Sequence, residues 1–179
     1  MTTNEKITKK VCCFYASDFH LEMTLLPYIN KKMEENKKVI VVTQNNLEES
    51  VKILISKINL KNKEKLIKID WNNKNLDNLT KKSTVIINGN KKFIEEINYK
   101  INEINKENNL ELEVVDCYLF DEIKNEISNI RDHYSAVINN LQKNTWKNTL
   151  YVIYYRNGKI RSNYSWKIQK GMNFLWSKN

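Results

Sequence analysis

Polar side chains that could hold a ligand follow four predicted strands of this 179-residue chain. Open α/β sheets usually bind their ligands outside the carboxyl ends of the strands. We therefore expect a pocket for a small molecule or a protein partner at that edge of the sheet. Its candidate residues are Tyr15, Ser17, Asp18, His20, Thr43, Gln44, Asn45, Asp70 and Asn88.

Some of these side chains have a commoner structural role. Ser17, Asp18 and Asn45 each precede an apolar stripe of helical spacing, and serine, aspartate and asparagine are preferred helix caps. Asn45 and Glu48 have the spacing of a capping-box variant. Trp71, next to Asp70, would then lie at the edge of the core. The capping interpretation is favoured over the pocket.

The sequence has little that could perform catalysis. It contains only two histidines, and no nucleophile stands at a recognisable spacing from either. Asp18 and His20 could form a general-base pair, but His20 and Glu22 would point to different faces of a helix, which argues against a metal site. We expect no catalytic residue, no metal and no cofactor, and therefore a protein that is not an enzyme.

The end of the chain has basic and aromatic side chains and no acidic ones. Residues 1–132 hold all 21 acidic side chains and 22 of the 30 basic ones, so the remaining eight basic side chains follow Asp132. Such a segment could bind nucleic acid by base stacking and phosphate neutralisation, with an affinity that falls steeply with salt. The alternation expected of an edge hairpin predicts the same arrangement without any function. The candidate residues are Arg156, Lys159, Arg161, Tyr164, Trp166, Lys167 and Lys170.

The order of apolar segments predicts an α/β fold. Residues 11–15, 38–43, 66–71, 83–88 and 112–120 read as strands, and those that are apolar on both faces belong inside a parallel sheet. Apolar stripes predict helices over 19–32, 47–58, 93–104 and 121–133. The expected architecture is a three-layer sandwich with a mostly parallel sheet, closed by an antiparallel hairpin over 149–170 with its turn at Asn157-Gly158.

The chain length fits one domain over residues 1–179, with a polar N-terminal tail (1–10) and a basic aromatic tail (171–179). No run is apolar enough to cross a bilayer or to act as a signal peptide, so we expect a cytoplasmic protein. Cys12, Cys13 and Cys117 lie in predicted strands, are odd in number and form no CxxC pair, which favours buried free thiols over disulfides or zinc.

Two segments resemble a known family. Residues 11–43, with the turn Phe14-Tyr15-Ala16-Ser17-Asp18 and with Leu25-Leu26-Pro27-Tyr28 in mid-helix, resemble the opening of MEDS sensory domains, which are relatives of the KaiC and RecA ATPases. A proline inside a helix costs about 3 kcal/mol, so its presence here is specific. Residues 132–141, 150–156 and 166–172 are similar to the closing strands of KaiC-type domains, which favours a strand over 136–141 and ends the preceding helix near His133.

The resemblance implies a RecA/KaiC-like domain without the Walker motifs. Ala16 to Leu21 stand where KaiC-type enzymes carry GxxxxGK[ST], and Asn88 stands where they carry an acid. ATP hydrolysis needs both groups. The resemblance therefore implies a non-catalytic regulatory or sensory domain in signal transduction, acting by binding a protein partner, a second copy of itself or a small ligand. A nucleic-acid-binding module and a residual nucleotide binder remain alternatives.

Overall fold

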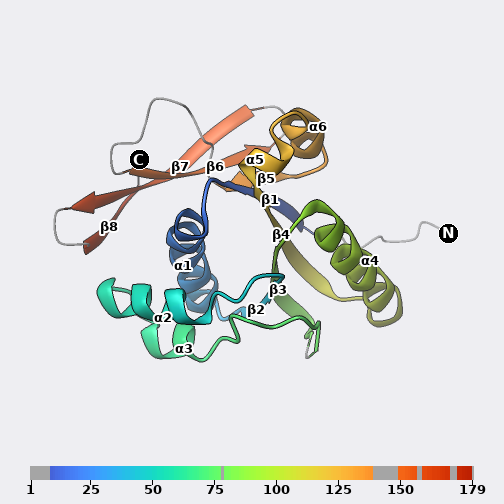
Figure 1. Ribbon diagram of the computed structural model, residues 1–179, viewed down its shortest axis with the longest axis horizontal. Helices are drawn as coiled ribbons and strands as arrows, with labels where there is room; N and C mark the ends of the chain where they lie inside the picture. The colour runs from blue at the N-terminus through green and yellow to red at the C-terminus, as the bar shows by residue number, and fades with distance from the viewer. Residues whose placement is uncertain (1–8, 78, 139–148, 157–158, 170–172, 179) are drawn as a thin grey trace.

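The computed structural model describes residues 9–77 and 79–138 with their side chains. In residues 149–156, 159–169 and 173–178 it describes the course of the backbone alone. The described ranges form an α/β fold in which helices pack against both faces of one sheet (Figure 1). The predicted α/β class is confirmed.

The chain opens with the predicted βαβ unit. It consists of β1 (Lys9–Tyr15), α1 (Asp18–Glu34) and β2 (Lys38–Thr43). Ser17 is the N-cap of α1, because its hydroxyl oxygen accepts a hydrogen bond from the backbone N–H of His20 at 3.3 Å. Pro27 lies inside α1, as the sequence predicts. The cap prediction is therefore confirmed for Ser17.

The rest of the chain adds further helices and strands to this unit. The predicted strand over 136–141 is confirmed for 136–138, and residues 139–141 lie outside the described residues. The elements after β2 are α2 (Glu48–Lys57), α3 (Lys63–Ile67), β3 (Lys82–Asn88), α4 (Lys91–Asn108), β4 (Glu111–Leu119), α5 (Phe120–Ile123), α6 (Ile127–Asp132), β5 (Ala136–Ile138), β6 (Thr149–Arg156), β7 (Lys159–Gln169) and β8 (Asn173–Lys178).

The predicted strand over 66–71 is wrong. Residues 63–67 form α3, and a turn then brings Trp71 back so that its indole N–H donates to the Leu66 carbonyl oxygen at 2.9 Å. Leu66 and Trp71 are both fully buried in one core cluster, whereas Ile67 is 45% exposed. Two residues five positions apart would point to opposite faces of a strand, so a helical turn is the conformation that buries both together.

Two helix starts also differ from the predictions. Leu47, not Asn45, is the N-cap of α2, and the Asn46 side chain accepts the Glu48 backbone N–H at 3.0 Å. The predicted helix over 121–133 is two short helices, α5 and α6, and Asp121 lies inside the first turn of α5 instead of capping it. The predicted end near His133 is confirmed, since His133 is the C-cap of α6.

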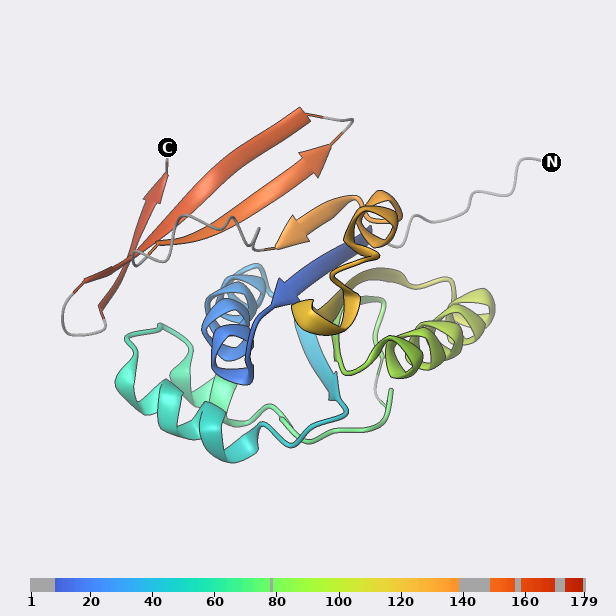
Figure 2. The same cartoon turned by 45° about the horizontal axis from the view of Figure 1, so that its top comes forward.

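The first five strands form a parallel sheet in the order β2-β3-β4-β1-β5 (Figure 2). In its register Tyr15 lies beside Leu119, Thr43 beside Asn88, and Asn88 beside Cys117. The carboxyl ends of β1 to β4 therefore meet at one edge of the sheet, as the sequence predicts. Their amino ends meet at the opposite edge.

Buried side chains form two clusters on opposite faces of this sheet. One packs α1, α2 and α3 against the strands, and the other packs α4, α5 and α6. This arrangement is that of a three-layer sandwich. Cys12, Cys13 and Cys117 are buried free thiols, as predicted.

The predicted closing hairpin stays a prediction. Its turn at residues 157–158 and all of its side chains lie outside the described residues. In the part of the chain that the structure describes, no helix is both long and apolar enough to cross a membrane.

Candidate functional site

At the carboxyl edge, the predicted site residues of β2 and β3 bind one another. Thr43 and Asn88 are both fully buried, and the Asn88 amide nitrogen donates to the Thr43 hydroxyl at 3.2 Å. The Thr43 hydroxyl in turn donates to the carbonyl oxygen of Asn45 at 2.7 Å. Asn88 Oδ1 is buried without a hydrogen-bond partner among the described residues. The unpaired Asn88 oxygen is the one observation at this edge that favours the predicted pocket. Ligand binding there stays a prediction.

The loop after β2 is held firmly in place. The ammonium group of Lys74 donates to the carbonyl oxygens of Thr43 and Gln44 at 2.6 and 2.7 Å. The Gln44 side-chain oxygen accepts the backbone N–H of Asn90 at 2.9 Å, and the Gln44 backbone N–H donates to the Asn88 carbonyl at 2.7 Å. These contacts tie the ends of β2 and β3 together and use polar groups that a ligand would otherwise meet.

Gly89 directly follows β3 and lies close to the Gln44 and Phe93 side chains, and we predict that Gly89→Ala destabilises the protein by about 1–3 kcal/mol. A Cβ atom there would lie 2.6 Å from the Phe93 ring and 2.9 Å from the Gln44 side-chain oxygen. Urea unfolding followed by circular dichroism measures the loss. The double variant Gly89→Ala/Phe93→Leu should recover part of it, and a single variant within 0.5 kcal/mol of wild type would contradict the predicted clash.

The predicted site residues near β1 and α3 also have structural partners. Tyr15 is buried, which raises the pKa of its phenol, and the Ala16 backbone N–H donates to His20 Nδ1 at 3.0 Å. Burial lowers the pKa of His20. Asp18 is exposed, and Asp70 accepts the Asn72 backbone N–H at 2.9 Å in a local turn. These contacts fit caps and turns better than a shared pocket.

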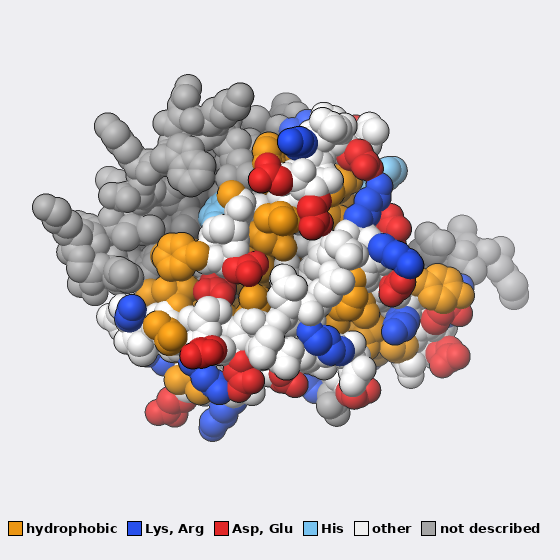
Figure 3. All heavy atoms as spheres, in the orientation of Figure 1, with side chains coloured by type: hydrophobic (Ala, Val, Ile, Leu, Met, Phe, Trp, Pro, Cys, Tyr) orange, Lys and Arg blue, Asp and Glu red, His pale blue; other side chains and the backbone are white. Residues whose placement is uncertain are grey.

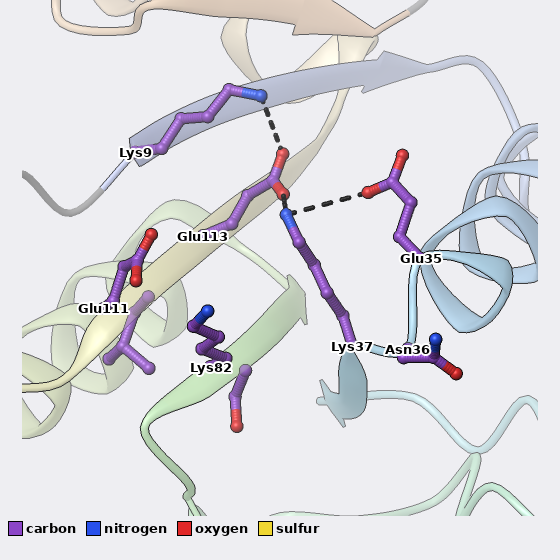
Figure 4. A pocket seen from close by; sticks show the side chains of 9 residues that line it. Lys9, Glu35, Asn36, Lys37, Lys82, Glu111 and Glu113 are labelled. Atoms are coloured by element: carbon purple, nitrogen blue, oxygen red, sulfur yellow. Dashed lines mark hydrogen bonds and ion pairs between the residues drawn. The ribbon is translucent and has the colours of Figure 1, made fainter.

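A hollow of about 260 Å³ lies at the opposite, amino edge of the sheet, around the buried carboxylate of Glu113 (Figure 4). Three lysines approach this carboxylate: Lys32 Nζ at 2.6 Å, Lys9 Nζ at 3.0 Å and Lys37 Nζ at 3.4 Å. The Tyr28 hydroxyl donates to it at 2.8 Å. Figure 4 shows two of these lysines on separate segments, with Lys9 on β1 and Lys37 just before β2. The third, Lys32, lies on α1.

The charges of this cluster hold Glu113 ionised. Burial by itself raises the pKa of Glu113, but the hydrogen bond and charge of Lys32, with those of Lys9, lower it to about 2. Burial lowers the pKa of Lys32, and Glu113 opposes that shift. The short Lys32–Glu113 contact is therefore a buried ion pair in which each charge offsets the desolvation of the other. We assign this cluster to stability.

A larger groove, of about 480 Å³, lies between α4 and α6 over β4. This volume is in the range of small-molecule sites. Its walls carry three tyrosines and three asparagines, among which Asn102 and Asn129 are exposed and make no side-chain hydrogen bond to any described residue. The other members of the lining are Lys10, Lys91, Ile94, Glu95, Asn98, Tyr99, Tyr118, Glu126, Ile130, His133 and Tyr134.

The carboxylate of Asp116 is fully buried beneath the groove. It accepts hydrogen bonds from the Tyr134 hydroxyl at 2.6 Å and from the Asn98 amide nitrogen at 2.9 and 3.0 Å. Burial raises the pKa of Asp116, while these hydrogen bonds and the charge of Lys10 oppose the increase. Burial also raises the pKa of Tyr134, and the nearby Asp116 charge adds to the shift. The network fixes the orientation of two side chains in the groove wall.

No family model matches this sequence, and no curated protein or solved structure is significantly similar to it. The function of the protein must therefore be inferred from the arrangement of its own residues.

Sequence reasoning missed both buried carboxylates. Glu113 and Asp116 interrupt β4, a strand whose other central residues are apolar and buried. Acidic side chains are almost never fully buried unless they are paired. The presence of two acids in a strand predicted to be buried could therefore have indicated that each acid has polar or charged partners.

The described residues do not support the other two kinds of site, a nucleic-acid interface and a metal centre. All of the predicted nucleic-acid-binding residues lie where side chains are outside the described residues, so that function stays a prediction. On the face shown in Figure 3, acidic and basic side chains are interspersed. Among the residues with described side chains, no three His, Cys, Asp or Glu residues are grouped so that they could hold a metal ion.

Proposed function

We propose that this protein is a non-catalytic regulatory or sensory domain that binds a small ligand in the groove between α4 and α6. The observation that supports this proposal best is the combination of a groove of about 480 Å³ with side-chain amides that have no hydrogen-bond partner among the described residues. Binding a protein partner or a second copy of the chain is the other form of the same function.

Three further features support a binding role for the groove. Its wall is partly preorganised, because Asp116 fixes Asn98 and Tyr134. Its lining combines apolar, aromatic and polar side chains, as ligand sites do. At the carboxyl edge, by contrast, the predicted site residues of β2 and β3 are occupied with one another. We also propose that the domain is RecA/KaiC-like and that β6 and β7 form its closing hairpin.

A thermal-shift screen of a metabolite library against three proteins tests this function. Asn129→Trp fills the groove from an exposed position on α6, and Ser128→Trp places the same bulk on the next residue, which is not part of the lining. A ligand at 100 times its Kd stabilises the folded state by about 2.7 kcal/mol. We expect a hit to raise the Tm of wild type and of Ser128→Trp, but not that of Asn129→Trp.

Two results would count against the proposal. A ligand that stabilises all three proteins equally binds outside the groove. If no compound stabilises the wild type, the small-ligand form is rejected and the protein-partner form remains, which sedimentation of the purified chain and capture of partners then test.

A further inference from the structure

The charges around the α4–α6 groove cancel, and both of its lysines are already engaged. With neutral histidine, its lining carries Lys10, Lys91, Glu95 and Glu126. Lys91 is paired with Glu126, and the ammonium group of Lys10 donates to Asn98 Oδ1 at 2.9 Å. An anionic ligand would therefore find no lysine without a partner among the described residues of the lining. Because the lining as a whole also carries no net charge, it favours an uncharged ligand.

The hydrogen-bond network beneath the groove sets the direction of its polar groups. Tyr134 has one hydroxyl proton and gives it to Asp116. In the 2.7 Å contact between the two tyrosine hydroxyls, Tyr118 must then be the donor. The oxygen of Tyr118 keeps a lone pair for a ligand donor. Asn98 is held at both ends, by Asp116 and by Lys10, so its amide cannot rotate freely.

The groups that suit an uncharged ligand are one exposed ring and two amides. Tyr99 is 66% exposed, the most exposed of the large hydrophobic side chains in the described part of the chain. Asn102 and Asn129 stand on opposite walls, on α4 and α6. Each amide presents a donor and an acceptor side by side, which matches the adjacent acceptor and donor on the edge of a nucleobase. An aromatic ring beside them can stack on a planar ligand.

We propose that the groove binds an uncharged planar heterocycle whose edge carries an adjacent hydrogen-bond donor and acceptor, as nucleobases and nucleosides do. This inference rests on the proposed function and names the ligand class for it. The heterocycle stacks against Tyr99, and its edge pairs with the amides of Asn102 and Asn129.

The test is a titration followed by the side-chain amide NMR signals of the asparagines. The probes are adenosine and uridine, adenosine 5′-monophosphate, glucose and spermidine. At least one nucleoside is expected to shift the signals of Asn102 and Asn129 saturably, whereas glucose and spermidine leave them in place. Because both lysines among the described residues of the groove are already engaged, the monophosphate should bind no more tightly than adenosine.

Two variants make the result specific to the groove. Tyr99→Ser removes the stacking ring and should weaken nucleoside binding at least fivefold. Phe19→Ser removes a similarly exposed aromatic side chain, 61% exposed on α1 outside the groove, and should leave the affinity unchanged. Both positions are at the surface, so circular dichroism should show folded variants.

The outcomes separate this inference from the proposed function. Tighter binding of the monophosphate, or shifts caused by glucose or spermidine instead, would overturn the ligand class and leave the groove as a binding site. Nucleosides that move none of the groove signals would also overturn it. In that case a hit from the thermal screen that moves these signals keeps the small-ligand form of the proposed function. The absence of such a hit rejects that form as well and leaves only the protein-partner form.

Discussion

Glu113→Gln is expected to lower the free energy of unfolding by about 3 kcal/mol or more. The substitution keeps the shape of the side chain but removes the charge that Lys9, Lys32 and Lys37 surround. Lys32 is only 4% exposed, so its ammonium group would be left buried without its main partner. Urea unfolding of both proteins at pH 7 measures the difference.

The neighbouring Glu111 provides the matched control. It lies on the same strand and in the same hollow, but it is exposed and makes no ion pair with any residue whose side chain is described. Glu111→Gln should therefore change stability by less than about 0.5 kcal/mol. The double variant Glu113→Gln/Lys32→Met removes both charges and should recover much of the lost stability. Equal effects of Glu113→Gln and Glu111→Gln would refute the role given to the cluster.

The pH dependence of stability gives a second measurement on the same residue. The pKa of Glu113 falls from an ordinary 4.5 to about 2 in the folded state. A carboxylate with a depressed folded pKa contributes stability above its unfolded pKa, and this stability is lost as the pH falls through the folded value. Wild type should thus lose about 3 kcal/mol more than Glu113→Gln between pH 5 and pH 2. The comparison cancels the opposite contributions of Glu22 and Asp116, whose pKa values are raised by burial.

Trp71→Ala is the second substitution with a large expected effect, a loss of about 3–5 kcal/mol. Trp71 is fully buried in the core cluster that joins α1, α2 and α3 to the sheet. Its removal leaves a cavity and also frees the Leu66 carbonyl oxygen from the indole N–H. Equilibrium unfolding in urea measures this loss, and near-ultraviolet circular dichroism shows whether the packing around α3 persists.

Ile67→Ala is the control for Trp71, because Ile67 lies on α3 beside Leu66 and is 45% exposed. It should cost no more than about 0.5 kcal/mol. A small effect of Trp71→Ala would mean that residues 66–71 do not pack as described. Such a result would also reopen their prediction as a strand.

The two substitutions with large expected effects remove buried side chains that are stabilised in different ways. Trp71 is held by apolar packing with one hydrogen bond, and Glu113 by a set of charges that offset its desolvation. Neither residue contributes to the α4–α6 groove, so variants at both positions should leave ligand binding intact wherever the protein remains folded. That expectation separates stability effects from binding effects in the experiments above.

The apolar pattern of the sequence determined the sheet and its first unit. Residues 39–43 and 84–87 are continuous apolar or β-branched runs, and β2 and β3 form around them nearly as predicted. Ser17 caps α1 because a hydroxyl at that position satisfies a free N–H of the first turn, which is a purely local effect. Local patterns were sufficient where each segment buries its side chains in the way its own periodicity suggests.

The same patterns failed where a distant contact decides the conformation. Residues 66–71 have the composition of a strand, yet Leu66 and Trp71 are drawn into one cluster by side chains from α1 and α2. Asn45 has the spacing of a cap, but Thr43 and Lys74 hold the loop before α2 in another conformation. These outcomes depend on residues far along the chain, which a local pattern does not contain.

The sequence by itself determined an α/β fold, free buried cysteines and the absence of a phosphate-binding loop after the first strand. Only the tertiary structure decided which polar groups meet: Glu113 with lysines from three segments, Asp116 with Asn98 and Tyr134, and the amides on either side of the α4–α6 groove. The physical reason is that periodicity tells which face of a segment is buried, whereas the strand order and the register choose its neighbours.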